Sequence, residues 1–205
     1  EQFRKIKKLI IGGGVVSKTL HEMLQKEETA CYATYGMTET ITHVAVKKLN
    51  GKDANDFYET LANVDITIDT RGCLVIDAPD VAEEKVVTND LVKVISPHKF
   101  QWLGRFDNII NSGGVKIIPE HVEALLSKYL ERRFFLSSLA DEVLGERLIL
   151  VIEGTIFSKK EKEELSIFMK NNLTKFSIPK EIFFVEKFIE TESGKIKRAA
   201  TQASI

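Results

Sequence analysis

Apolar and polar residues alternate along residues 64–104, and this alternation restricts the fold more than any other feature of the chain. Side chains at every second position lie on one face of a strand, so a period of two predicts β-strands here. Two turn sequences, Thr70-Arg71-Gly72 and Ser96-Pro97-His98-Lys99, interrupt the alternation. Each turn is expected to return the chain into a neighbouring strand, which gives two hairpins in a β-rich, barrel-like portion.

The residues before these hairpins predict the edge of an α/β sheet. Two apolar strands are expected at residues 8–11 and 30–34, each ending in a turn of small residues. Between them, Ser17 is expected to cap a helix with one apolar face, formed by Leu20, Met23 and Leu24.

The pattern changes again after Gly104. The expected elements are, in order, a hairpin at residues 108–118, a helix at 120–129 that begins after Pro119, strands at 134–139 and 148–152, a helix from Ser158, and a strand at 182–185. Ser158 and Glu161 fit a capping box at the start of the second helix. The order β-α-β-β-α-β is typical of a compact α+β domain, so we place a domain boundary at residues 105–107.

Composition excludes several kinds of protein. The 29 Lys and Arg residues balance 30 Asp and Glu residues, whereas proteins that bind nucleic acid through its phosphates carry a basic excess. No apolar run approaches the roughly 18 residues of a membrane-spanning helix. Cys31 and Cys73 have no CxxC spacing, so we expect reduced core thiols in a cytoplasmic protein rather than a disulfide or a zinc site. We expect no secretory or transit segment and, because no starting Met is present, an excised piece of a longer chain.

Four motifs follow one another in an order that resembles the adenylate-forming acyl-CoA synthetase superfamily. They are Tyr35-Gly36-Met37-Thr38-Glu39-Thr40, Thr88-Asn89-Asp90, the run from Gly104-Arg105 to Ser112-Gly113-Gly114, and Ser193-Gly194-Lys195-Ile196-Lys197-Arg198. The resemblance covers essentially the whole chain. It implies that residues 1–106 are the C-terminal part of a large AMP-binding domain and that residues 107–205 are a small, mobile C-terminal domain. The expected fold class is therefore α/β followed by α+β.

In this family a carboxylate attacks the α-phosphate of ATP, and CoA then displaces AMP from the acyl-adenylate. The resemblance therefore implies ATP, CoA and a small-molecule carboxylate as substrates, with Mg²⁺ as cofactor. It places the Tyr35 ring on adenine, Gly36 and Met37 beside the nucleotide, the Thr38 hydroxyl on the α-phosphate and the Glu39 carboxylate on Mg²⁺. Carboxylate oxygen is a ligand type that suits magnesium. From the residues alone, the same segment also reads as a strand-ending turn with Gly36 at positive φ.

Asp90 and Arg105 resemble the pair with which the family binds the ribose hydroxyls. The family's usual Thr-Gly-Asp reads Thr88-Asn89-Asp90 here, and since Asn tolerates positive φ, we expect the turn to persist. Gly12-Gly13-Gly14 resembles a loop that runs beside adenine and the acyl pocket, although Gly14 and Val15 stand where the family has Ala and Pro. We do not expect these glycines to form a phosphate-binding P-loop, although Lys18-Thr19 follows them.

Asp107 lies where the family has its hinge, and rotation there exchanges two catalytic faces. One face presents Lys195, whose ammonium offsets the repulsion between a carboxylate and a phosphate. The other presents Gly113 and Gly114, which leave a tunnel for the pantetheine arm of CoA. From the residues alone, Lys195 also reads as a solvated surface lysine and the two glycines as an ordinary hairpin turn.

Within the family, the chain looks most like the o-succinylbenzoate-CoA ligases of menaquinone biosynthesis. Another aryl- or fatty-acyl-CoA ligase, or a non-catalytic module that keeps the fold, stays open as an alternative. The family's phosphate-gripping loop and most of its acyl pocket would lie upstream, so these 205 residues alone are expected to be inactive. We expect neither nucleic acid nor a membrane as partner and leave a homodimer open. His43 follows the Thr-Glu-Thr segment closely enough to reach an acyl pocket.

Overall fold

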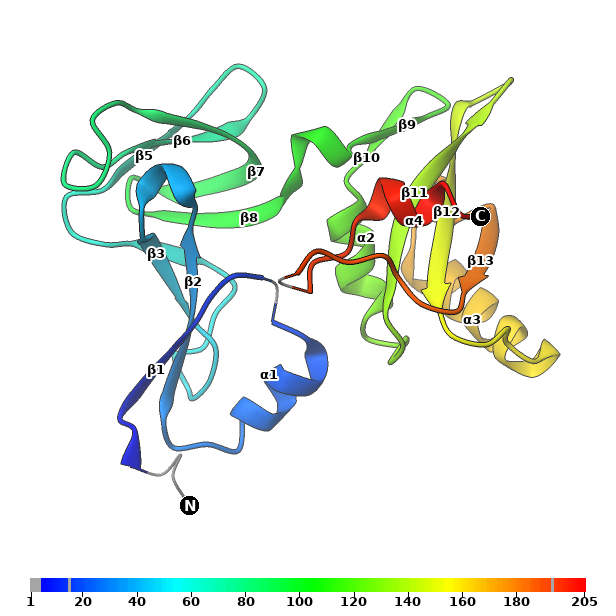
Figure 1. Cartoon of the computed structure of the whole chain (residues 1–205), viewed down its shortest axis with the longest axis horizontal. Helices are drawn as coiled ribbons and strands as arrows, with labels where there is room; N and C mark the ends of the chain where they lie inside the picture. The colour runs from blue at the N-terminus through cyan, green and yellow to red at the C-terminus, as the bar shows by residue number, and fades with distance from the viewer. Residues whose placement is uncertain (1–4, 15, 193) are drawn as a thin grey trace. The chain divides into compact units, whose positions relative to one another are not determined.

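A computed structural model describes residues 5–14, 16–192 and 194–205 of the chain. The chain divides into two compact units, Glu1–Phe106 and Asp107–Ile205. Figure 1 shows that each unit is built on its own β-sheet with a few short helices. The fold class predicted from the sequence, an α/β segment followed by an α+β segment, is confirmed.

The first unit is an open eight-stranded sheet with the strand order β1-β2-β3-β4-β8-β7-β6-β5. Its strands are β1 (Lys8–Ile11), β2 (Ala30–Gly36), β3 (His43–Lys48), β4 (Tyr58–Thr60), β5 (Asp65–Ile68), β6 (Cys73–Asp77), β7 (Val86–Ser96) and β8 (Lys99–Arg105). β1 and β2 are parallel, and the other pairs are antiparallel. The predicted hairpins are β5–β6 and β7–β8. They lie in this sheet, whose edges are β1 and β5, so the described residues form no closed barrel.

The helix α1 (Lys18–Leu24) connects the two parallel strands. The Ser17 hydroxyl accepts a 3.2 Å hydrogen bond from the backbone N–H of Leu20, which satisfies one of the free N–H groups at the helix start. Leu24 is buried against Cys31, but Met23 is 60% exposed. The predicted apolar face of this helix is therefore narrower than its spacing suggested.

A β-bulge lies between Tyr35 and Gly36 at the end of β2. Tyr35 is opposite Ala45 of β3, but Gly36 is opposite His43, so the register skips one residue of β3. A Cβ on Gly36 would lie 2.5 Å from the carbonyl oxygen of Thr42 and 2.6 Å from His43 Cα. The positive φ considered for Gly36 is wrong. Glycine is required here because the two strands approach closely.

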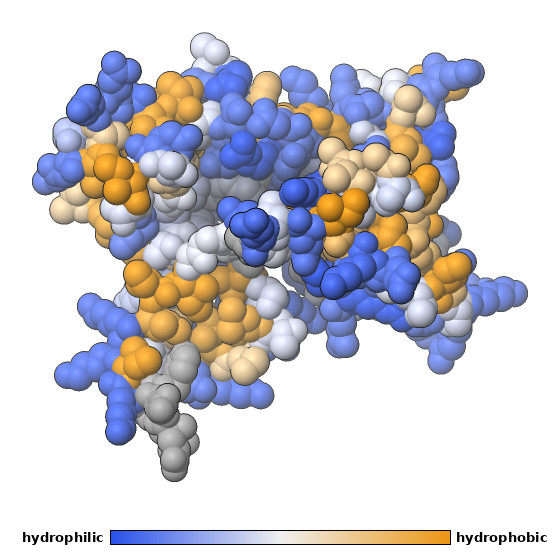
Figure 2. Space-filling model, viewed as in Figure 1, coloured by the Kyte–Doolittle hydropathy of each residue, from blue (hydrophilic) through white to orange (hydrophobic). Residues whose placement is uncertain are grey.

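Two apolar clusters form the core of the first unit. One contains Leu24 and Cys31 beside α1, and the larger one contains Leu74, Ile76 and Phe100 within the hairpins. Cys31 and Cys73 form no disulfide and both residues are buried, as predicted for core thiols. At the surface, Figure 2 shows apolar side chains over β1 and α1.

The second unit has a five-stranded sheet in the order β10-β9-β12-β11, with β13 parallel to β12. Its elements are β9 (Ile110–Ser112), β10 (Val115–Ile117), α2 (Pro119–Leu126), β11 (Phe134–Asp141), β12 (Gly145–Glu153), α3 (Lys159–Asn172), β13 (Glu181–Val185) and α4 (Arg198–Gln202). The predicted hairpin, helices and strands are all present. However, α2 ends at Leu126, and Tyr129 lies beyond it as an exposed residue.

The central strand β12 is buried on both faces. Leu148, Leu150 and Ile152 pack with Leu126 of α2 and Leu165 of α3. The intervening residues, Ile149 and Val151, pack with Phe135 and Phe188 on the other face. The helix α3 begins with the predicted capping box, in which the Ser158 N–H donates to Glu161 Oε2 at 2.7 Å and the Glu161 N–H donates to Ser158 Oγ at 3.3 Å. Among the described residues, no helix is long and apolar enough to cross a membrane.

Candidate functional site

An open cleft of about 760 Å³ lies where β1 and β2 end. Because these strands are parallel, their carboxyl ends meet at one edge of the sheet. The lining of this cleft includes Gly12 and Gly13 from the loop after β1, and Gly36, Met37, Thr38 and His43 from the segment after β2. The structure therefore brings together two motifs that the sequence assigned to nucleotide binding.

In the Gly12-Gly13-Gly14 loop after β1, close packing requires a glycine at Gly12 but not at Gly14. A Cβ on Gly12 would clash with Thr34 Oγ1, whereas a Cβ on Gly14 would meet no heavy atom within 4 Å. Val15, where the family has Pro, lies outside the described residues. The loop thus approaches β2 closely at Gly12 and is open at Gly14.

The short helix η2 (Thr38–Thr40) separates two hollows. Thr38 lines the cleft, and Glu39 lines a second hollow of about 530 Å³ together with residues 81–87. Ile41 lines both hollows and is 82% exposed. Its φ of 60° is a conformation that costs a β-branched residue on the order of 1–3 kcal/mol. The predicted residues Thr38 and Glu39 are therefore adjacent in the chain but line different hollows.

The Asp90 carboxylate contacts three side chains of the first unit. Its carboxylate accepts hydrogen bonds from the Tyr35 hydroxyl, at 2.6 Å to Oδ2, and from the Trp102 indole N–H, at 3.2 Å to Oδ1. The NH1 group of Arg105 lies 3.5 Å from Oδ1. The Asp90 side chain is 9% exposed and that of Arg105 is 45% exposed. Three predicted residues, Tyr35, Asp90 and Arg105, thus lie in one cluster.

The Tyr35 hydroxyl stays a hydrogen-bond donor over the whole physiological pH range. Burial raises the pKa of Tyr35 far above its usual value, and the negative Asp90 carboxylate raises it further. Because the phenol stays neutral, the Tyr35 hydroxyl keeps its proton and can always donate a hydrogen bond to the Asp90 carboxylate.

Asp90 lies within a continuous strand and not in the predicted turn. β7 (Val86–Ser96) pairs with β6 on one side and with β8 on the other, and the register of the β6 pairing shifts between Val87 and Leu91. The positive φ expected at Asn89 is wrong, because the non-glycine residues with positive φ in the described part of the chain are Ile41 and Asn63. The Asn89 side chain instead accepts a 2.8 Å hydrogen bond from Arg71.

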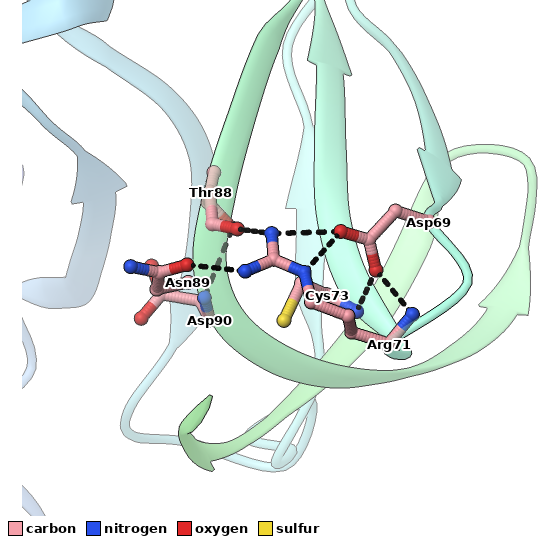
Figure 3. A network of polar contacts seen from close by, with 6 residues as sticks. All are labelled: Asp69, Arg71, Cys73, Thr88, Asn89 and Asp90. Carbon is pink, nitrogen blue, oxygen red and sulfur yellow. Dashed lines mark hydrogen bonds and ion pairs between the residues drawn. The ribbon is translucent and has the colours of Figure 1, made fainter. Parts of the chain in front are cut away.

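Arg71, in the turn between β5 and β6, holds this part of β7 (Figure 3). Its guanidinium donates to Asn89 Oδ1 at 2.8 Å and to the backbone carbonyl of Thr88 at 3.1 Å. Arg71 Nε also donates to Asp69 Oδ2 at 2.8 Å. In addition, the guanidinium lies over the ring of Phe106, 5.2 Å from its centroid.

Lys195 lies in a short antiparallel segment of the second unit. Glu190 pairs with Ile196, the Lys195 N–H donates to Thr191 Oγ1 at 3.0 Å, and the Lys195 carbonyl accepts from the Thr191 N–H at 2.8 Å. Lys195 is exposed. Ser193, the first residue of the motif, lies outside the described residues.

A partly buried ion pair anchors the chain just after this segment. Arg198 NH1 and NH2 each donate to one oxygen of Glu123, both at 2.9 Å. Glu123 Oε1 also accepts from the Leu136 N–H at 2.7 Å. A bidentate pair of this kind is directional, so it fixes the start of α4 against α2 and β11.

Gly113 and Gly114 form the turn between β9 and β10, with φ of 59° and 80°. The Gly113 N–H donates to the Leu144 carbonyl at 2.9 Å, and a Cβ on Gly114 would meet no heavy atom within 4 Å. Asp107 is exposed in the short helix η3 (Phe106–Asn108), where the two units join. The tunnel and the hinge stay predictions.

The sequence analysis missed Trp102, which contacts Asp90, and Arg71, which contacts the two residues before it. Trp102 is the chain's single tryptophan and stands two positions before Gly104, which is the only signal that could have singled it out. Arg71 has no local signal, because its partners Thr88 and Asn89 are 17 and 18 residues away and belong to another hairpin.

A magnesium ion would need help from the nucleotide at this site. In residues 5–14, 16–192 and 194–205, no three His, Cys, Asp or Glu side chains gather into a metal site. Magnesium bound to a nucleotide takes most of its ligands from phosphate oxygens and water, so a single protein carboxylate is sufficient. Glu39 is exposed and lines a hollow, so it fits that requirement.

The chain is similar in sequence to CoA ligases, although no family model matches it. A 2-succinylbenzoate–CoA ligase from Listeria monocytogenes is 26% identical over 215 residues, which cover 94% of this chain and 45% of that protein. An oxalate–CoA ligase from Saccharomyces cerevisiae is 36% identical over 102 residues, which cover 46% of this chain and 18% of that protein. The chain thus spans less than half the length of these curated relatives.

Solved structures give the same result. An acyl-CoA synthetase (AMP-forming)/AMP-acid ligase II-like protein from Dyadobacter fermentans is 36% identical with a TM-score of 0.51, over 96% of this chain and 57% of that one. The O-succinylbenzoate Coenzyme A Synthetase from Bacillus subtilis, in complex with ATP and magnesium ion, is 21% identical with a TM-score of 0.75, over 96% of this chain and 46% of that one. The second likeness is one of fold. Over nearly its whole length, the chain is similar to the C-terminal part of AMP-forming acyl-CoA synthetases.

Proposed function

We propose that the chain is part of an AMP-forming acyl-CoA ligase, which activates a carboxylic acid as an acyl-adenylate and transfers the acyl group to CoA. The meeting of Tyr35, Asp90 and Arg105 in one cluster carries this proposal. An ionised carboxylate has about four lone-pair sites. Tyr35 uses one on Oδ2, Trp102 uses one on Oδ1 and Arg105 lies 3.5 Å from Oδ1, so Asp90 retains acceptor capacity on Oδ2 for a ribose hydroxyl.

The remaining residues of the first unit take roles along the bound nucleotide. Gly12, Gly13 and Gly36 bring backbone close to the cleft, where a flat adenine ring needs little width. The Thr38 hydroxyl donates to a phosphate oxygen. When bound, Mg²⁺ would neutralise phosphate charge, and Glu39 would be its protein ligand.

The second unit supplies two faces that act in turn. In the first half-reaction, Lys195 places its ammonium between the carboxylate and the α-phosphate, where two anions must approach. In the second, the turn of Gly113 and Gly114 admits the pantetheine arm of CoA. Asp107 would absorb the change of backbone angles between the two states.

Two acids are favoured by different observations. The match over 94% of the chain to a 2-succinylbenzoate–CoA ligase supports o-succinylbenzoate, as in a cytoplasmic enzyme of menaquinone biosynthesis. The higher identity to oxalate–CoA ligase, over about half of the chain, supports a much smaller dicarboxylate. His43 lines the cleft and is a candidate contact for either acid.

The test is exchange of pyrophosphate into ATP by the full-length protein, with o-succinylbenzoate, oxalate, an aromatic acid and a fatty acid offered separately. Exchange that depends on one acid identifies the substrate and supports the ligase. If no acid supports exchange while ATP still binds, the non-catalytic alternative is correct. Absence of ATP binding would contradict the nucleotide site itself.

A further inference from the structure

Arg71 contacts three parts of the first unit, and the function proposed above assigns it no role. Its guanidinium contacts Asp69 in its own turn, Thr88 and Asn89 in β7, and the ring of Phe106. Phe106 is the last residue of the first unit. Figure 3 shows the guanidinium between Asp69 and the β7 residues that precede Asp90.

These contacts act on the residues that precede Asp90. The Arg71 guanidinium binds the carbonyl of Thr88 and the side chain of Asn89, while the Thr88 hydroxyl accepts the Asp90 N–H at 3.0 Å. The backbone on the N-terminal side of Asp90 is therefore fixed by Arg71 directly and by Thr88 in turn.

Only an arginine can make all of these contacts at once. The guanidinium has five N–H donors in one plane, whereas the lysine ammonium has three donors on a single atom. The donors of Arg71 reach Asp69, Thr88 and Asn89 in different directions. Asn89, which stands where the family has Gly, supplies the acceptor that completes the set.

We propose that Arg71 is a positioning residue for nucleotide binding. By holding Thr88 and Asn89, it sets the orientation in which the Asp90 carboxylate meets the ribose, and Arg71 and Asn89 work as a pair. The ligand in this statement rests on the function proposed above. The effect of Arg71 on Asp90 does not, and it can be measured without a nucleotide.

The single tryptophan of the chain reports on Asp90, because the Trp102 indole N–H donates to its carboxylate. The indole ¹H–¹⁵N NMR signal would be recorded for the 205-residue chain and for the variants Arg71→Lys and Asn89→Ala. Arg132→Lys is the matched control. Arg132 also contacts a carbonyl (Thr155, 2.6 Å), a carboxylate (Glu161, 4.0 Å) and an aromatic ring (Phe157, 4.7 Å), but in the second unit.

We expect the indole signal to shift in Arg71→Lys and Asn89→Ala and to stay in place in Arg132→Lys. In the full-length protein, we expect the Kd for ATP to rise about tenfold in Arg71→Lys, the scale of one hydrogen bond to a charged group. The double variant Arg71→Lys/Asn89→Ala should be no worse than Arg71→Lys alone.

An unshifted indole signal in Arg71→Lys would overturn the proposal, and so would a shifted signal with an unchanged Kd for ATP. A general loss of stability is recognised separately from the melting temperature, in which Arg132→Lys serves as reference. If the wild-type full-length protein binds no ATP, the proposed function fails. The indole signal then still decides whether Arg71 orients Asp90.

Discussion

The Tyr35 hydroxyl and the Asp90 carboxylate, 55 residues apart in the chain, are joined by a 2.6 Å hydrogen bond. Their strands β2 and β7 are not neighbours, because β3, β4 and β8 lie between them in the sheet order. The sheet must therefore curve enough to bring its strands face to face. The Tyr35 ring packs against Phe100 in the core, with 5.2 Å between ring centroids. Its hydroxyl group binds Asp90.

Removal of this hydroxyl should weaken both the fold and the nucleotide site. We expect Tyr35→Phe to lower the free energy of unfolding by about 1–3 kcal/mol, because the buried Asp90 carboxylate loses a donor. The Kd for ATP should rise in the same variant. Tyr58→Phe is the control, since Tyr58 packs in the same aromatic cluster. Equal losses in both variants, measured by urea denaturation, would show that the bond to Asp90 adds nothing.

Lys195 should matter for only one half-reaction. We expect Lys195→Ala in the full-length protein to slow acyl-adenylate formation on the order of 10²-fold or more, the scale of one aimed electrostatic donor. Thioester formation from a supplied acyl-adenylate should change little. Lys197→Ala, two positions away and also exposed, is the control and should be nearly silent. Equal damage to both half-reactions would mean that Lys195 supports the fold of the second unit.

Gly36 and Gly14 should respond in opposite ways to the same change. Gly36→Ala places a Cβ 2.5 Å from a backbone oxygen that cannot move away alone, so we expect a loss of stability of about 1–3 kcal/mol and a distorted cleft. Gly14→Ala meets open space and should be neutral or slightly stabilising. Thermal denaturation of the two variants compares them directly. A Gly36→Ala protein as stable as wild type would mean that β2 and β3 separate easily.

The network around Arg71 should fail in acid. Burial alone would raise the pKa of the Asp69 carboxyl, but hydrogen bonds from the Cys73 N–H and from Arg71 hold it below its ordinary value of 3.8. A depressed pKa means that the unfolded chain takes up the proton first, so this stabilisation is complete above the ordinary pKa and is lost as pH falls below it. Denaturation between about pH 2.5 and 6 should show this decrease in wild type and a smaller one in Asp69→Asn. Asp53→Asn, an exposed aspartate, should match the wild-type profile.

The Glu123–Arg198 pair should be far more important than a surface pair. Glu123→Ala leaves the Arg198 guanidinium and the Leu136 N–H without their carboxylate, and we expect a loss of about 3 kcal/mol in the second unit. Glu163→Ala, which breaks an exposed pair with Lys159, should cost at most about 0.5 kcal/mol. Similar losses in the two variants would show that the Glu123–Arg198 pair is dispensable.

Local sequence signals predicted the elements well. The helix caps at Ser17 and at Ser158 with Glu161 depend on contacts between residues three positions apart. Both helices begin directly after these caps, as predicted. Alternation and turn residues were equally sufficient for the two hairpins. These features depend on neighbours in the chain, so tertiary contacts had little opportunity to change them.

The errors in the predicted backbone conformations have one physical cause, which is that contacts between strands decided them and not the local sequence. Asn89 was assigned to a turn from its motif, but it lies within strand β7, where the pairing with β6 shifts register, and it has no positive φ. A positive φ was considered for Gly36 as an alternative, but contact with Thr42 and His43 is what requires a glycine. The links from Asp90 to Tyr35 and Trp102 could not be predicted either, because they depend on how the sheet curves.

The bulge after Tyr35 also bears on how such a site could change over evolution. Because the register skips one residue of β3, a single insertion or deletion near residue 42 could move the bulge along the ladder. Such a shift would turn His43 away from the cleft and bring its neighbour Val44 toward it, and neither residue would have been replaced. Chain length at this one point is therefore a means of exchanging an imidazole for an aliphatic side chain in the lining of the cleft.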